Sequence, residues 1–132
     1  MAQNGSNDRT ANAEPDEPQP TAPQPTEPQL AAAANTFALL ASPSRLHLVH
    51  LMSGGQFDVG TLAEKVGLSL PTTSQHLSKL RLAGIVSVRR EGRHSYYTVE
   101  DPHVLNLVEQ IFEHIAPDGT LAPDPPLKDS PA

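Results

Sequence analysis

Between Thr72 and Lys79 the chain has a run of small hydroxyl side chains, one amide and one cation, and three arginines lie within residues 89–93. The polar residues of the run are Thr72, Thr73, Ser74, Gln75, Ser78 and Lys79. Glutamine pairs bidentately with adenine, and hydroxyls reach phosphates or base edges, so these residue types suit a DNA major groove. The arginines, which can neutralise backbone phosphates, are Arg89, Arg90 and Arg93. The pattern predicts contacts with double-stranded DNA, and its alternative is an ordinary solvated surface.

Two short helices joined by a tight turn are predicted to position the polar run. Asp58 can cap one helix that ends at Gly67, and Ser69 can cap a second helix that ends at Gly84. The inward-facing residues of the two helices are Leu62, Ala63, Val66, Leu77 and Leu80. Because only about three or four residues separate the helices, they must cross at a large angle, which is the geometry of a helix-turn-helix.

A β-hairpin is predicted after Gly84, because the apolar period changes from that of a helix to strict alternation. Its strands contain Ile85, Val86 and Val88 on one side and His94, Tyr96, Tyr97 and Val99 on the other. The turn falls at Glu91-Gly92, so the three arginines surround the tip and can reach phosphate or the minor groove. The alternative is a charged turn that only protects a sheet edge from aggregation.

Two further helices are predicted before this motif and one after it. An alanine-rich helix starts near Leu30, and Ser42-Pro43 begins the next one, which stops at Gly54-Gly55. Asp101-Pro102 caps the last helix. Its apolar residues cover more than one stripe: Val104, Leu105, Leu107, Val108, Ile111, Phe112 and Ile115. A small core cannot bury all of these apolar side chains, so the helix needs a second surface to pack against. We therefore expect the last helix and the alanine-rich helix to form a homodimer interface.

Composition confines the fold to one central domain. Residues 1–30 and 117–132 are rich in proline and acidic side chains, so both are predicted to be disordered tails, with one winged domain over residues 31–116. The net charge of −6 comes from the two ends of the chain, because residues 35–116 contain seven basic and seven acidic residues and are neutral as a whole. Residues 69–99 have a local excess of four positive charges, and this local field is what a nucleic acid meets.

The cysteine count and the hydropathy exclude several classes of protein. The chain has no cysteine, which rules out disulfides and thiolate metal sites. No apolar run approaches the roughly 18 residues of a membrane span, and we expect a cytoplasmic protein that makes no membrane contact. A small metal-dependent hydrolase is disfavoured, because no nucleophile-base pair or lid is visible, and we predict that the chain is not an enzyme.

Several motifs together resemble the ArsR/SmtB family of bacterial winged-helix, metal-responsive repressors over residues 35–116. These motifs are Pro43-Ser44-Arg45-Leu46, Leu62-Ala63, Ser74-Gln75-His76-Leu77, Ala83-Gly84-Ile85-Val86, Gly92-Arg93 and Tyr96-Tyr97. The resemblance implies a mainly α fold with a small β-hairpin, a homodimer, and a transcriptional regulator that releases operator DNA when it binds an inducer.

The resemblance also implies a regulatory metal site. The family's cysteine site in the third helix is absent, because Asp58-Val59-Gly60 occupies that place. A second family site in the last helix is matched by Asp101, His103 and His114. Two imidazoles and a carboxylate suit Zn²⁺, Ni²⁺ or Co²⁺.

The spacing of these residues requires two chains. Eleven residues span about 16 Å of helix, so one ion cannot bind both histidines of one chain. Two antiparallel copies of the helix bring His114 of one beside Asp101 and His103 of the other. The family's fourth ligand is replaced by Pro117, which favours the alternative of a winged-helix regulator with no metal site and another ligand or protein as its control.

Overall fold

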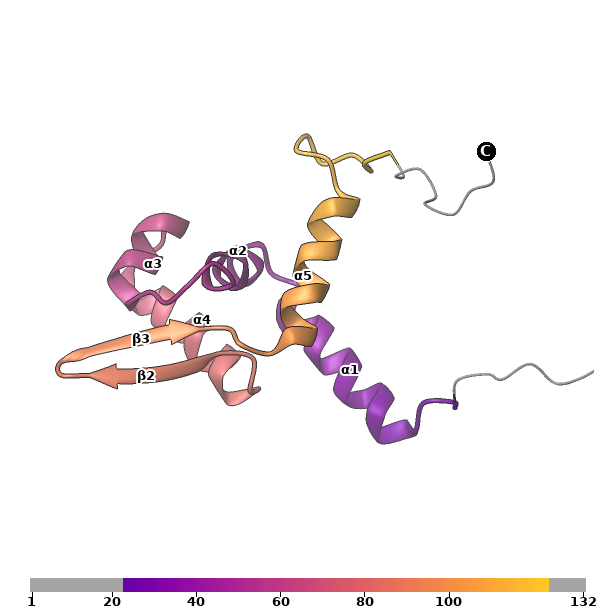
Figure 1. Cartoon of the computed structure of the whole chain (residues 1–132), viewed down its shortest axis with the longest axis horizontal. Coiled ribbons are helices and arrows are strands. Elements are labelled where there is room, and N and C mark those ends of the chain that lie inside the picture. The colour runs from indigo at the N-terminus through magenta and orange to yellow at the C-terminus, as the bar shows by residue number, and fades with distance from the viewer. Residues whose placement is uncertain (1–22, 124–132) are drawn as a thin grey trace, which may run out of the picture. The chain divides into compact units, whose positions relative to one another are not determined.

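A computed structural model describes residues 23–123 of the chain. The chain divides into two units after Leu30, and the hydrophobic core and the hairpin belong to the second. The elements are α1 (Glu27–Leu40), α2 (Pro43–Met52), α3 (Val59–Val66), α4 (Leu70–Leu82), β2 (Ser87–Glu91), β3 (His94–Thr98) and α5 (Pro102–His114) (Figure 1). This is the element order that the sequence predicts.

Local capping residues explain where the helices begin and end. The side chains of Ser42, Asp58, Ser69 and Asp101 each accept a hydrogen bond from a backbone N–H in the first turn of the following helix. Gly67 has φ 73°, the left-handed conformation that ends α3 and lets the chain turn at once into α4. The caps inferred from the sequence are confirmed, and they fix the short link between α3 and α4.

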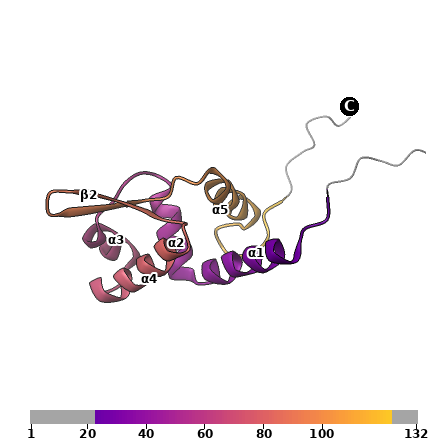
Figure 2. The ribbon, with the colours of Figure 1, turned by 90° about the horizontal axis from the view of Figure 1, so that it is seen from below.

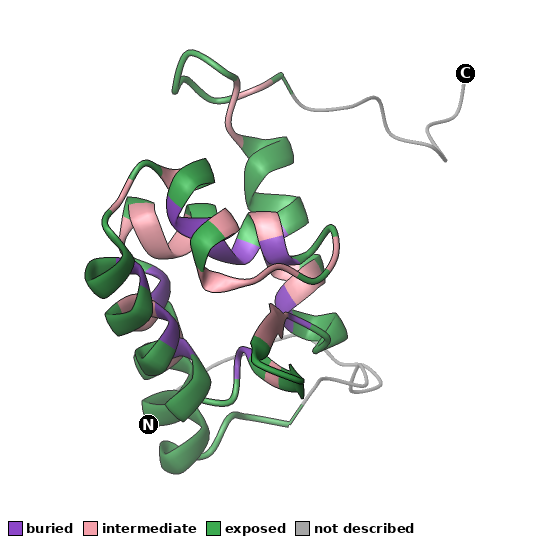
Figure 3. Ribbon diagram, turned by 90° about the vertical axis from the view of Figure 1, so that its left-hand side faces the viewer, coloured by how far each residue is buried: buried purple, intermediate pink, exposed green. Residues whose placement is uncertain are grey.

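The hydrophobic core gathers around α2, which packs on α3, α4 and α5. Its fully buried large side chains are Leu48, Val49, Met52, Leu62, Leu77, Leu80 and Val108. Figure 3 shows the buried positions on the inward sides of the helices, and most residues of α1 are exposed. The predicted inward residues of α3 and α4 therefore hold the two helices against α2.

The hairpin is a two-stranded antiparallel sheet in which Val88 pairs with Tyr97 and Arg89 with Tyr96. An isolated bridge between Phe57 and Tyr97 ties the chain before α3 to β3. Tyr97 packs against the core, so the neighbouring Tyr96 points to the opposite face. The hairpin and α4 lie at the same end of the second unit, away from α5 (Figure 2).

The described ends of the chain differ from the predicted tail boundaries. Helix α1 begins at Glu27, before the boundary expected at residue 30. After α5 the chain folds back, and the N–H of Ala122 donates to the carbonyl of His114 at 2.9 Å. The remainder of both predicted tails, 1–22 and 124–132, lies outside the described residues. Within residues 23–123, each helix is too short or too polar to cross a bilayer.

Removing the Asp58 carboxylate should destabilise the fold in a pH-dependent way. The backbone N–H of Thr61 donates to Asp58 Oδ1 at 2.8 Å, and this bond holds the pKa of Asp58 below its ordinary value of 3.8. A carboxyl with a lowered folded-state pKa stabilises the fold above its unfolded pKa, and this contribution is lost as the pH falls through the folded value. Asp58→Ala should therefore lower the melting temperature at pH 7.

The matched control is Asp58→Asn, which can still cap the helix but does not titrate. The difference in melting temperature between the wild type and Asp58→Asn should shrink between pH 7 and pH 3. An unchanged difference over this range would contradict the assignment of the stabilising charge to this cap.

Candidate nucleic-acid interface

The outer surface of α4 is built mainly from the predicted polar run. Thr72, Ser74, Gln75, Ser78 and Lys79 are all exposed. Gln75 and Ser78 lie on the side of the helix opposite to the buried leucines, as their spacing along a helix requires. The structure therefore presents an amide, hydroxyls and an ammonium group on one outward surface.

The prediction for Thr73 as a DNA contact is wrong. Its side chain is 0% exposed, and its Oγ1 donates to the carbonyl of Ser69 at 2.8 Å. Thr73 is four residues before Leu77 and seven before Leu80, so all three share the inward face of α4. The hydroxyl is satisfied inside the first turn, and the methyl group contributes to the core.

A polar contact that the sequence does not reveal connects α4 to the helices behind it. Arg45 Nη1 lies 3.3 Å from His76 Nδ1, and Arg45 Nε donates to the carbonyl of Leu39 near the end of α1. Burial lowers the pKa of His76, and the charges of Arg45 and Lys79 lower it further. A neutral imidazole can accept a hydrogen bond from the guanidinium, so Arg45 helps to fix α4 relative to α1 and α2.

The three arginines of the hairpin lie in different surroundings. Arg89 Nη2 donates to Gln56 Oε1 at 2.8 Å, and its Nη1 lies 3.2 Å from a carboxylate oxygen of Glu91. Its guanidinium also stands over the Tyr96 ring, 5.2 Å from the centroid. Arg89 is therefore held against the hairpin.

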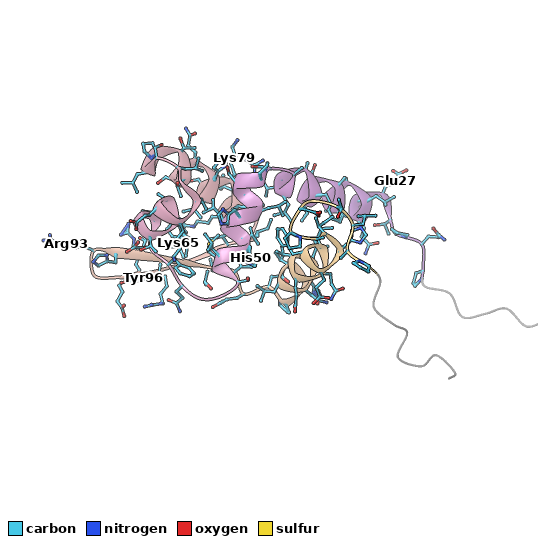
Figure 4. The ribbon with its side chains drawn as sticks, turned by 90° about the horizontal axis from the view of Figure 1, so that it is seen from above. Glu27, His50, Lys65, Lys79, Arg93 and Tyr96 are labelled. Atoms are coloured by element: carbon cyan, nitrogen blue, oxygen red, sulfur yellow. The ribbon has the colours of Figure 1, made fainter. Side chains whose placement is uncertain are left out.

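Arg90 and Arg93 are both exposed, and within residues 23–123 neither forms an ion pair. Figure 4 shows Arg93 at the far end of the hairpin. The glycine before it has φ 64°, a conformation that makes the tight turn possible. These two arginines are better placed than Arg89 to meet a phosphate.

The predicted metal ligands lie at opposite ends of α5. His103 Nδ1 lies 3.9 Å from Asp101 Oδ1, and the His103 side chain is 85% exposed. His114 is the last residue of the helix. In the part of the chain that the structure describes, no three His, Cys, Asp or Glu side chains are grouped so that they could hold an ion. One chain therefore brings Asp101 and His103 together but not His114.

The α3–turn–α4 unit and the hairpin beside it define a winged helix-turn-helix DNA-binding protein. Residues 42–88 match the family described as "Bacterial regulatory protein, arsR family". The regulator KmtR of Mycobacterium tuberculosis is 37% identical over 92 residues, which cover 67% of this chain and 71% of KmtR. The chain belongs to the ArsR family of bacterial transcriptional regulators, and it is not an enzyme.

Solved structures support the same fold. The crystal structure of NolR from Sinorhizobium fredii has a TM-score of 0.63 and 36% sequence identity, covering 72% of this chain and 94% of NolR. The homodimeric winged helix-turn-helix domain of Mb0332 from Mycobacterium bovis has a TM-score of 0.59 and 31% identity, covering 63% of this chain and 77% of that domain. The predicted mainly α winged-helix fold is confirmed.

Proposed function

We propose that the chain binds operator DNA as a homodimer and represses transcription. The observation that supports this proposal is the joint exposure of the α4 polar surface and the arginine tip of the hairpin at one end of the fold (Figure 2). A recognition helix in the major groove and a basic wing on the flanking backbone use these two surfaces together. Two such units in a dimer read half-sites about 34 Å apart.

Exposed apolar side chains on α1 and α5 support the dimer. Phe37 is 58% exposed, Ile111 41% and Phe112 46%. An apolar groove between the two helices is lined by Phe37, Leu40, Ala41, Leu46, Leu107, Val108 and Ile111. Large contiguous apolar surface of this kind is usually covered by another protein surface. Because the similar Mb0332 domain is homodimeric, a second copy of this chain is the partner that we propose for this apolar surface.

Arg93→Ala should weaken operator binding and reduce its dependence on salt. Each lost phosphate contact lowers the slope of log affinity against log salt by about one. The measurement is a titration of a labelled duplex by the purified protein at several salt concentrations. Arg89→Ala is the matched control, because its guanidinium is already engaged by Gln56 and Glu91. Equal slopes for Arg93→Ala and the wild type would contradict the wing contact.

We further propose that a transition-metal ion controls the repressor. The donor set supports this: Asp101 and His103 are already adjacent, and His114 is exposed at the other end of the same helix. Paired α5 helices would supply both imidazoles and the carboxylate to Zn²⁺, Ni²⁺ or Co²⁺. Bound metal would favour a dimer that fits DNA poorly, so metal and DNA would weaken each other's binding equally.

The second candidate function is a regulator of the same fold that is controlled by another ligand or by a protein partner. The observation that favours it is Pro117, which offers no side-chain donor atom three residues after His114. Titration of the purified protein with Zn²⁺, Ni²⁺ and Co²⁺ separates the two candidates.

A further inference from the structure

Leu70, the first residue of α4, is exposed, as is Leu82 at the other end of the helix, whereas the two leucines between them are buried. Leu70 is 53% exposed, whereas Leu77 is 1% exposed and Leu80 is 0% exposed. The first residues of a recognition helix are the ones that reach base edges in a helix-turn-helix complex. An apolar side chain is therefore present at the position that reaches base edges in such complexes.

The hydroxyls around Leu70 are engaged within the protein. Ser69 Oγ accepts from the backbone N–H of Thr72 at 3.2 Å and donates to Thr72 Oγ1 at 3.0 Å. Thr73 is buried and bonds to the Ser69 carbonyl. The next residue, Pro71, has neither a polar side chain nor a backbone N–H. Leu70 and Pro71 therefore give this first turn exposed apolar surface.

We propose that Leu70 selects thymine at one position of each half-site by packing against the C5-methyl group. This inference rests on the proposed operator binding. In the major groove the thymine methyl is the one apolar group that a base pair presents, so a leucine there can discriminate only through that methyl. Gln75 and Ser78 lie further along α4 and can donate or accept hydrogen bonds, so Leu70 would add a contact of a different chemical kind.

The experiment starts from a high-affinity duplex selected out of a random-sequence pool with the purified full chain. Each thymine of the selected site is then replaced in turn by deoxyuridine, which keeps the hydrogen-bonding edge and lacks only the methyl. Burial of one methyl group corresponds to about a fourfold change in affinity. We expect a loss of about fourfold per half-site at one thymine position with the wild-type protein.

The same substitutions are measured with Leu70→Ala, which should bind the thymine site more weakly and show no further loss with deoxyuridine at that position. Leu82→Ala is the control, because Leu82 is 90% exposed at the other end of α4. It should keep the wild-type response to deoxyuridine. Circular dichroism and thermal unfolding confirm that both variants are folded.

Three results would overturn the inference: a selected site without a shared thymine, no loss with deoxyuridine at any position in the wild type, or an undiminished loss in Leu70→Ala. Failure of the wild-type chain to bind any selected duplex at low salt would instead contradict the proposed operator binding. The two failures are therefore distinguishable.

Discussion

Replacing Ile111 with glutamate is expected to convert the proposed dimer into monomers and to weaken operator binding by about a hundredfold or more. Ile111 on α5 lines the same groove as Phe37 of α1 and is 41% exposed, so the substitution changes the surface of one chain rather than its core. In a homodimer the new charge would be buried twice across the two-fold axis. A monomer loses the effective concentration that links two half-sites, which is worth 10² or more in affinity.

Sedimentation velocity measures the oligomeric state, and titration of a two-half-site duplex measures the affinity. Leu121→Glu is the control, because Leu121 is 65% exposed but lies after α5, outside the groove between α1 and α5. It should leave both quantities unchanged. A dimeric Ile111→Glu protein with wild-type affinity would refute the α1–α5 interface.

The helix boundaries and the fold class could be predicted because they depend on local chemistry. Ser42, Asp58, Ser69 and Asp101 each precede a helix start, and each side chain does accept a backbone N–H there. The change from helical to alternating apolar spacing after Gly84 likewise marks the hairpin. Caps and changes of apolar spacing lie within a few residues of the helix end or strand that they determine.

The location of Thr73 follows from its position along the helix rather than from its residue type. A threonine looks like part of the polar surface, yet its spacing from Leu77 and Leu80 places it on the inward face. The helical spacing was therefore a sufficient signal. Once the methyl group packs inward, the hydroxyl is satisfied by the Ser69 carbonyl, so burial leaves no unpaired polar group.

Other features of the site depend on contacts between residues far apart in the sequence. Arg89 is held by Gln56, and His76 lies beside Arg45, more than thirty positions away in each case. No periodicity or cap indicates such pairs, because the tertiary fold creates them. The three hairpin arginines are therefore equivalent as far as the sequence shows. In the structure Arg89 is held by Gln56 and Glu91, whereas Arg90 and Arg93 are exposed without an ion pair in the described residues.

Metal binding should be abolished in both His103→Ala and His114→Ala, each measured by titration with Zn²⁺, Ni²⁺ and Co²⁺. Each substitution removes one imidazole from a site that has only two imidazoles and a carboxylate, and metal-induced release of operator DNA should disappear with it. His47→Ala is the control, because His47 is an exposed histidine on α2 outside this donor set. It should bind metal as the wild type does.

A mixture of the two variants tests whether the site is shared between chains. In a dimer with antiparallel α5 helices, one site of a mixed dimer would lack both imidazoles, while the other would combine the intact His103 of one chain with the intact His114 of its partner. Mixing and refolding the two inactive variants should therefore restore one metal site per mixed dimer. A site within a single chain could not be restored in this way, because every chain in the mixture lacks one ligand. Undiminished metal affinity in both single variants would instead favour the regulator controlled by another ligand or a protein partner.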